Sequence, residues 1–163
     1  KDIWPAQAAE KMIENLNSKI TEEMKKDTET SKQSFFEILT MASLIEKEAF
    51  DSLEERRIIS GILWKRLESN IPLQVDAGLT YVTGKPSSKL TEDDLKIDSP
   101  YNTYKYRGLP LGPIANPGLE SIKAALYPLP SPYWYYLHDR RGKIHYARNF
   151  EEHKKNKAKY LYD

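Results

Sequence analysis

Two glutamates, Glu46 and Glu48, lie near the end of an unusually apolar segment, FFEILTMASLIEKEAF, that spans residues 35–50. At about 100° per residue in a helix, Leu44 and Ile45 fall on the side of Glu48, whereas Glu46 points to the other side. The two carboxylates therefore do not share one site. A carboxyl group held against apolar side chains has a raised pKa, because burial disfavours its charged form. Glu48 is a candidate general acid, and the alternative is that it ends a core helix and reaches water.

A second set of polar residues follows at Gln74 and Asp76, in the run from Ile71 to Gly78. This run is expected to form a turn after the third helix, where an amide and a carboxylate would be exposed. Asp76 could be a second carboxylate across a cleft from Glu48, a group that binds the substrate, or a cap for the element that follows. The sequence leaves these three roles open.

Tyrosines and prolines are concentrated in the second half of the chain. Eight of the eleven tyrosines fall between Tyr101 and Tyr146, and seven of the ten prolines lie in residues 100–132. Rigid loops that combine aromatic faces with amide groups suit a sugar polymer, whose rings have apolar faces and whose hydroxyls need hydrogen-bond partners. The alternative is that these tyrosines pack the loops onto the helices. The candidate contacts with a glycan are Gln74, Asp76, Tyr101, Asn102, Tyr104 and Asn116.

Composition excludes several other classes of protein. The 163 residues carry 25 Lys and Arg against 24 Asp and Glu, so the net charge of +1 indicates neither a nucleic acid nor an anionic membrane as partner. The absence of cysteine removes disulfides, thiolate metal sites and thiol nucleophiles. His138, His145 and His153 lack the spacing of a metal site, although His145 and His153 could reach one surface. No phosphate-binding glycine loop or Gly-x-Ser-x-Gly motif is present, and no cofactor is expected.

Helix signals dominate the first 70 residues. Apolar spacing predicts one amphipathic helix from Ala6 to Lys26, a linker over residues 27–34, and the buried helix that carries Glu48. Ser52, with a glutamate three residues later, is typical of an N-terminal cap and predicts a third helix that ends near Asn70.

The remaining residues predict short elements between loops. Two short helices are expected at residues 92–95, capped by Thr91, and at residues 119–127. Residues 133–148 predict a β-hairpin with its turn at 139–142, and Asn149 is expected to cap a final helix to about Tyr160. Further strands are conceivable near Leu73 or Ile114. The fold class is therefore α+β: a helix-rich N-terminal part packed against a small antiparallel sheet, with long Pro-rich loops.

No run of about 18 apolar residues indicates a membrane span. Because the chain begins at Lys1 without methionine, it is interpreted as part of a longer protein. Residues 1–30 are interpreted as an amphipathic helix, a linker or the tail of an upstream region, and residues 31–163 as the catalytic domain.

Five segments, read in order, resemble the MltG family of YceG-like endolytic murein transglycosylases. They are LTMASLIEKEA (39–49), LQVDAGLTYVTG (73–84), SPYNTYKYRGLPLGPIANPG (99–118), SIKAALYP (121–128) and FEEH (150–153). The resemblance covers about residues 35–160. It implies a YceG-like catalytic domain in which Glu48, the second glutamate of Glu-Lys-Glu, is the catalytic acid and base.

The same resemblance implies cleavage of the β-1,4 bond between N-acetylmuramic acid and N-acetylglucosamine in nascent peptidoglycan, which leaves a 1,6-anhydromuramoyl end and terminates glycan elongation. It also implies an N-terminal membrane anchor in the full-length protein, with the catalytic part on the extracytoplasmic face of the bacterial cytoplasmic membrane. Glycan strands are the expected partner, and cell-wall synthesis enzymes are further candidates. Two alternatives stay open: a muramidase that uses Glu48 and Asp76, and a non-catalytic peptidoglycan-binding module.

Overall fold

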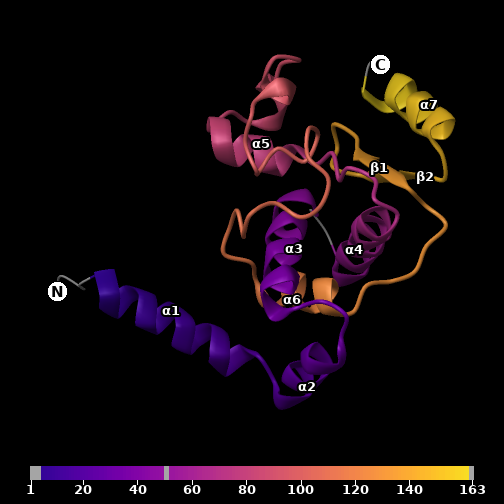
Figure 1. Cartoon of the computed structure of the whole chain (residues 1–163). Helices are drawn as coiled ribbons and strands as arrows, with labels where there is room; N and C mark the ends of the chain where they lie inside the picture. The colour runs from indigo at the N-terminus through magenta and orange to yellow at the C-terminus, as the bar shows by residue number, and fades with distance from the viewer. Residues whose placement is uncertain (1–4, 50–51, 162–163) are drawn as a thin grey trace. The chain divides into compact units, whose positions relative to one another are not determined.

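The computed structural model describes residues 5–49 and 52–161, and it divides into two compact units at the start of the third helix. Unit 1 comprises residues 1–35 and unit 2 residues 36–163. Figure 1 shows the order of the elements along the chain.

Unit 1 contains two helices, α1 (Pro5–Lys19) and α2 (Glu22–Thr30). The prediction of one continuous helix from Ala6 to Lys26 is therefore wrong. Thr21 has an extended backbone, and its hydroxyl accepts a hydrogen bond from the Met24 N–H at 3.1 Å, so it caps a new helix instead of continuing the first. The apolar spacing continues across this break, which is why periodicity alone does not reveal it.

The centre of unit 2 is formed by helices α3 (Phe35–Glu48), α4 (Leu53–Glu68) and α6 (Leu119–Leu126). Ser52 caps α4 as predicted, with its hydroxyl accepting the Glu55 N–H at 3.2 Å. The Trp64 indole donates to the carbonyl oxygen of Ala125 at 2.9 Å and so joins α4 to α6. The large apolar side chains that these three helices bury completely are Ile38, Met41, Leu44, Ile45, Ile59, Ile62, Leu63 and Ile122.

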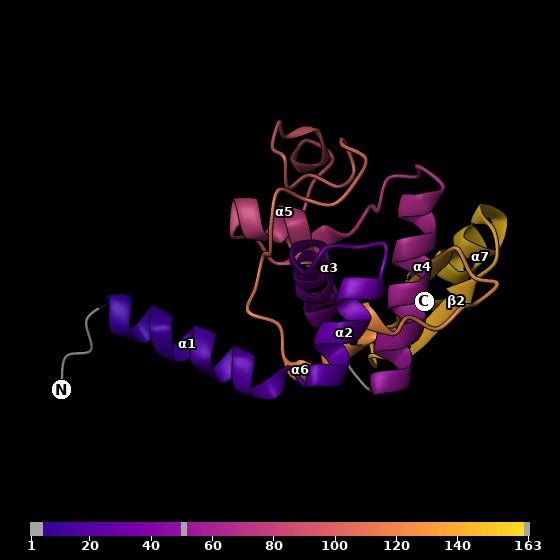
Figure 2. The same ribbon diagram turned by 60° about the horizontal axis from the view of Figure 1, so that its bottom comes forward.

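Helix α5 (Asp76–Thr83) lies at one end of α3 in both views (Figure 1 and Figure 2). The Pro-rich loop approaches this helix so closely that a Cβ on Gly78 would lie 2.1 Å from the carbonyl oxygen of Tyr101. Two single-turn 3-10 helices follow, η1 (Ser87–Lys89) and η2 (Asp94–Lys96). The helix predicted at residues 92–95 is thus a single 3-10 turn over Asp94–Lys96, and its N-cap is Asp93 instead of Thr91. The Thr91 hydroxyl accepts the Asp94 N–H at 3.3 Å from outside the turn.

The hairpin pairs β1 (Tyr135–His138) with β2 (Ile144–Ala147) in antiparallel register, and Tyr136 lies opposite Tyr146. Helix α7 (Phe150–Leu161) packs on both strands and begins at the predicted cap, where the side-chain oxygen Oδ1 of Asn149 accepts the Glu152 N–H at 2.9 Å. Both views place this layer beside α4 (Figure 2). The predicted hairpin and final helix are confirmed.

The strands considered near Leu73 and Ile114 do not form, because each segment bonds to a side chain or loop instead of a sheet. The Val75 N–H donates to the Thr103 hydroxyl at 3.0 Å, and the Ile114 N–H donates to the buried Ser43 hydroxyl at 3.0 Å. The α+β prediction is nevertheless confirmed, with one two-stranded sheet among the described residues. Over residues 5–49 and 52–161, no helix is long and apolar enough to cross a membrane.

Candidate active site

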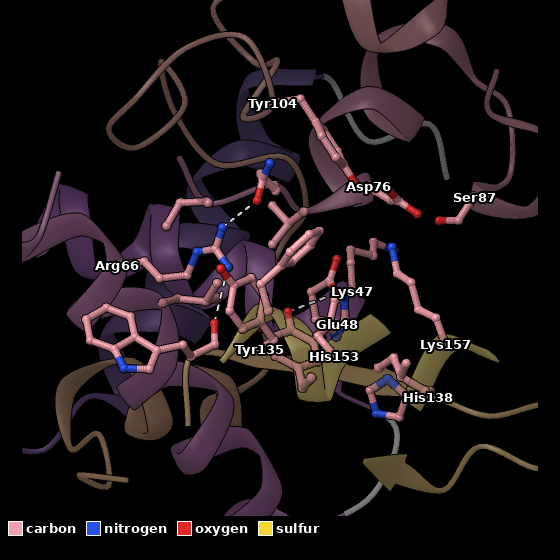
Figure 3. Close-up of a pocket in the computed structure, with 18 of the residues that line it drawn as sticks. Lys47, Glu48, Arg66, Asp76, Ser87, Tyr104, Tyr135, His138, His153 and Lys157 are labelled. Atoms are coloured by element: carbon pink, nitrogen blue, oxygen red, sulfur yellow. Dashed lines mark hydrogen bonds between the residues drawn. The ribbon is translucent and has the colours of Figure 1, made fainter. Parts of the chain in front are cut away.

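A cavity of about 520 Å³ opens between the end of α3, the start of α5, the hairpin and α7 (Figure 3). Its volume lies within the range of about 300–1,000 Å³ that is usual for small-molecule sites. Glu48, the last residue of α3, lines this cavity. Met41, Leu44 and Ile45 are completely buried on the same side of the helix, as the spacing predicts.

The Glu48 carboxyl is held in a protonatable state by its surroundings. Its pKa is raised from 4.5 to about 7, chiefly by burial and to a smaller extent by the negative charge of Asp76. Two hydrogen bonds act in the opposite direction: the Tyr136 hydroxyl donates to Oε2 at 3.0 Å, and the Ala77 backbone N–H also stabilises the charged form. Burial is the largest effect, so near neutral pH the carboxyl is partly protonated. Glu48 nevertheless keeps partial exposure, which a proton donor to a ligand requires.

Glu46 belongs to a different environment. Its Oε2 accepts hydrogen bonds from the Ser121 hydroxyl at 2.6 Å and from the Gly118 N–H at 3.1 Å, both at the start of α6. A carboxylate at this position satisfies free donors of a helix N-terminus. In the Glu-Lys-Glu sequence, the first glutamate therefore bonds to α6, whereas the second lines the cavity.

Asp76 and Tyr104 face the cavity as a pair. Asp76 is the first residue of α5, and its Oδ1 accepts a hydrogen bond of 2.6 Å from the Tyr104 hydroxyl. The N-terminal cap of α5 is Val75, which makes no side-chain cap bond, so Asp76 does not act as the cap. Both Asp76 and Tyr104 line the same cavity as Glu48. The structure thus brings a second carboxylate and a phenol to the acid.

Gln74 is held in place by a buried cation. Its side-chain oxygen accepts a hydrogen bond of 2.6 Å from Nη2 of Arg66. The same Nη2 also donates to the carbonyl oxygen of Pro72, and Nη1 of Arg66 donates to the carbonyl oxygen of Trp134. Arg66 is only 5% exposed, and burial lowers its pKa. Gln74 has a φ of 55°, a backbone conformation that non-glycine residues adopt rarely and mostly where the surrounding contacts enforce it.

The structure does not bring all the predicted residues to the cavity. Asn102 is completely buried: its amide donates to the carbonyl oxygens of Leu95 and Ile97, and its Oδ1 accepts two backbone N–H groups. It organises the loop and lies outside the cavity wall. Tyr101 packs its ring on Tyr81 at 5.0 Å, and Asn116 is exposed on the loop before α6; neither lines the cavity.

Several cavity residues are not identified by the sequence, above all Tyr136, Arg66 and His153. His153 stacks on Tyr135 at 5.0 Å, and burial together with the charges of Lys157 and Arg66 lowers its pKa to about 4. The sequence contains only unspecific indications of these residues. Tyr136 is one of many tyrosines in its segment, and His153 belongs to the FEEH motif, but neither pattern shows that the side chain faces a cavity.

His145 and His153 do not meet at this site. His145 bonds to Asp139 at 2.9 Å and stacks on Tyr160 instead of facing the cavity. Within the part of the chain that the structure describes, no group of three or more His, Cys, Asp or Glu side chains could hold a metal ion.

Comparison with known proteins identifies the relatives of this chain. A model of the YceG-like family matches residues 1–159. An endolytic murein transglycosylase of Bacillus subtilis (strain 168) is 42% identical over 150 residues, which are 92% of this chain and 41% of that protein. An endolytic murein transglycosylase of Streptococcus pneumoniae serotype 2 (strain D39) is 40% identical over 131 residues, covering 77% of this chain and 24% of that protein.

The fold has a counterpart among solved structures. The crystal structure of a YceG-like protein from Listeria monocytogenes superposes with a TM-score of 0.87 at 38% identity, over 95% of this chain and 50% of that one. The chain spans less than half the length of the two transglycosylases above.

Proposed function

The chain belongs to the YceG-like family, and from that premise we propose that it cleaves the β-1,4 bond between N-acetylmuramic acid and N-acetylglucosamine in peptidoglycan strands. The observation that carries the proposal is the Glu48 carboxyl, whose pKa is raised to about 7 in a cavity large enough for sugar residues. A single acid whose pKa lies near neutral pH can donate a proton and then accept one. The names of the two relatives from Bacillus and Streptococcus support the same activity.

The proposed reaction uses Glu48 twice. The protonated carboxyl donates its proton to the glycosidic oxygen while the bond from this oxygen to the muramoyl C1 breaks, and positive charge develops at C1. The resulting carboxylate then removes the proton of the C6 hydroxyl of the same sugar as the C6 oxygen bonds to C1. The acid is regenerated, a 1,6-anhydromuramoyl end forms, and no water is consumed. Cleavage within a nascent strand would terminate its elongation.

The neighbouring groups have supporting roles in this proposal. Tyr136 donates to Oε2 of Glu48 and fixes the direction of the carboxyl. Asp76 lies close enough to raise the pKa of Glu48, so its negative charge would also favour the positive charge that develops at C1. Gln74 and Tyr104 present polar groups to the same cavity and would bind hydroxyl or acetamido groups of the glycan. Tyr101 and Asn102 would act through the loop that they stabilise, and Asn116 would contact the glycan only where a strand extends beyond the cavity.

The cellular setting follows from the family resemblance. We expect residues 31–163 to be the catalytic domain of a full-length protein whose membrane anchor holds it at the extracytoplasmic face of the bacterial cytoplasmic membrane. There it would meet nascent glycan strands and the cell-wall synthesis enzymes that make them.

Product analysis tests this proposal directly. Purified glycan strands are incubated with the wild-type chain, with Glu48→Gln and with Glu46→Gln as the matched control, and the products are identified by mass spectrometry. We expect anhydro ends from the wild type and from Glu46→Gln, because residue 46 lies outside the cavity and glutamine keeps a side-chain oxygen that accepts the same two hydrogen bonds from Gly118 and Ser121. Glu48→Gln should give no cleavage although it folds, since an amide cannot donate and recover the proton.

Two other outcomes would contradict the proposed reaction. Products heavier by one water, with reducing muramic acid ends, would show a hydrolase in which Asp76 assists Glu48. Intact strands after prolonged incubation with the wild type, together with measurable binding, would identify a binding module. Cleavage by Glu48→Gln at a rate similar to that of the wild type would remove Glu48 from the catalytic role.

A further inference from the structure

The cavity that holds the two carboxylates also has two lysines in its wall, Lys47 and Lys157. Lys47 precedes Glu48 at the end of α3, whereas Lys157 belongs to α7, more than a hundred residues later. In Figure 3 their labelled side chains extend toward each other at the side of the cavity near Glu48. Two helices distant in the sequence thus bring two ammonium groups to one place beside the proposed acid.

Within residues 5–49 and 52–161, neither Lys47 nor Lys157 forms an ion pair with a carboxylate. The lysines that do form such ion pairs are Lys25, Lys85, Lys96, Lys105, Lys123 and Lys154. Glu48 and Asp76 line the same cavity, but their side chains bond to Tyr136 and Tyr104 instead of to these lysines. An anion that enters the cavity beside these two lysines can therefore accept charge-assisted hydrogen bonds from both of them. The charge of Lys157 also acts inside the cavity, where it contributes to the lowered pKa of His153.

The chemistry of the proposed substrate indicates which anion belongs there. The sugar rings of peptidoglycan are neutral, and the negative charges are carried by the lactyl group on C3 of muramic acid or by the peptide attached to it. C3 lies on the same ring as C1, the atom that reacts beside Glu48. A carboxylate carried by this lactyl group would therefore lie near the acid when the muramoyl ring is in place.

We propose that Lys47 and Lys157 form a subsite for a carboxylate on the lactyl arm of the muramoyl residue. This inference rests on the proposed function and deepens it: the subsite selects the sugar whose C1 faces Glu48. N-acetylglucosamine has no lactyl arm, so a glucosaminyl ring in this position would leave both ammonium groups without a partner. Charge-assisted hydrogen bonds from lysine to carboxylate supply the discrimination.

Binding measurements on the Glu48→Gln background test the subsite without turnover. Titration calorimetry compares three muramoyl glycan fragments: one with free lactyl carboxylates, one with attached peptides, and one whose lactyl carboxylates are converted to neutral methylamides. Lys47→Ala and Lys157→Ala should each weaken binding of a carboxylate-bearing fragment about fivefold, the factor typical of a favourable ion pair near a surface. The methylamide fragment should bind these variants as it binds their parent.

Lys155→Ala is the matched control, because Lys155 is an exposed residue of α7 that does not line the cavity. It should leave all three affinities unchanged. A loss confined to the fragment with free lactyl groups assigns the subsite to the lactyl carboxylate, and a loss confined to the peptide-bearing fragment assigns it to the peptide.

Two results would overturn the subsite: equal affinities of Lys47→Ala, Lys157→Ala and the parent for every fragment, or an equal loss for the methylamide fragment. Failure of the proposed function is a separate result, since it would appear as absent or hydrolytic cleavage by the wild type while the binding pattern stays the same.

Discussion

Replacing Glu48 with glutamine should stabilise the protein, and by an amount that grows as the pH rises. Burial raises the pKa of this carboxyl from 4.5 to about 7, so the folded state binds the proton more tightly than the unfolded chain does. The stabilising contribution of the protonated group is complete below pH 4.5 and is lost as the pH rises through about 7. Above that range the folded protein must hold a buried carboxylate, whereas glutamine stays neutral at every pH.

The two pKa values give the magnitude of the effect. At about 1.4 kcal/mol for each pKa unit, the difference between 4.5 and about 7 corresponds to about 3 kcal/mol in the free energy of unfolding. The free energy of unfolding of Glu48→Gln minus that of the wild type should therefore increase by about this amount between pH 4.5 and pH 8. Other titrating groups are common to both proteins and cancel in the difference.

Urea unfolding at a series of pH values, followed by circular dichroism, measures this difference. Glu46→Gln is the control for the same chemical change on the same helix, at a carboxylate that bonds to Ser121 and Gly118 and does not line the cavity. A difference between Glu48→Gln and wild type that stays constant over the whole pH range would refute the burial argument. A wild type that gains stability over the variant with rising pH would refute it as well.

Tyr136→Phe removes a hydrogen bond that favours the charged form of Glu48, so the pKa of Glu48 should rise. The fall in cleavage rate at alkaline pH should then move up by about one pH unit. An unchanged pH–rate profile would show that this hydrogen bond does not influence the pKa of Glu48. Asn102→Ala should lower the free energy of unfolding by about 2 kcal/mol, measured by denaturant, because it leaves buried backbone groups without partners; a neutral effect would show that water replaces the amide. Gly78→Ala should destabilise by about 3 kcal/mol in thermal unfolding, since its Cβ would lie 2.1 Å from the Tyr101 carbonyl oxygen; wild-type stability would mean that the loop moves freely away from α5.

Local signals in the sequence predict much of the fold. Ser52 and Asn149 each place a side-chain oxygen before a run of helix-forming residues, and both cap a helix in the structure. Such caps act within four residues, so the sequence contains all the information that they need. The break at Thr21 is also a local cap, but it lies inside a continuous apolar stripe that predicts a helix equally well. A new helix capped by Thr21 and a continuation of the first helix are both compatible with the local sequence, so the sequence alone does not predict the break.

The site is less predictable because it depends on distant contacts. The direction of Glu48 follows from helical geometry, but the donor that reaches its carboxyl, Tyr136, comes from a hairpin 88 residues later. Asn102 shows the opposite error: an amide in a polar loop appears suited to binding a ligand, yet its hydrogen bonds are all used inside the protein. Which polar residues face a cavity is decided by packing, and residue type alone does not indicate it.

The bond between Glu46 and the start of α6 has a mechanical consequence. If the last turn of α3 rotated about the helix axis, the side chain of Glu48 would be displaced. A rotation equivalent to one residue would turn Glu48 by about 100° away from the cavity. The two bonds of Glu46 to Gly118 and Ser121 act as a rotational lock that opposes such a twist. The direction of the Glu48 carboxyl is therefore set by contacts outside the cavity, independently of any ligand.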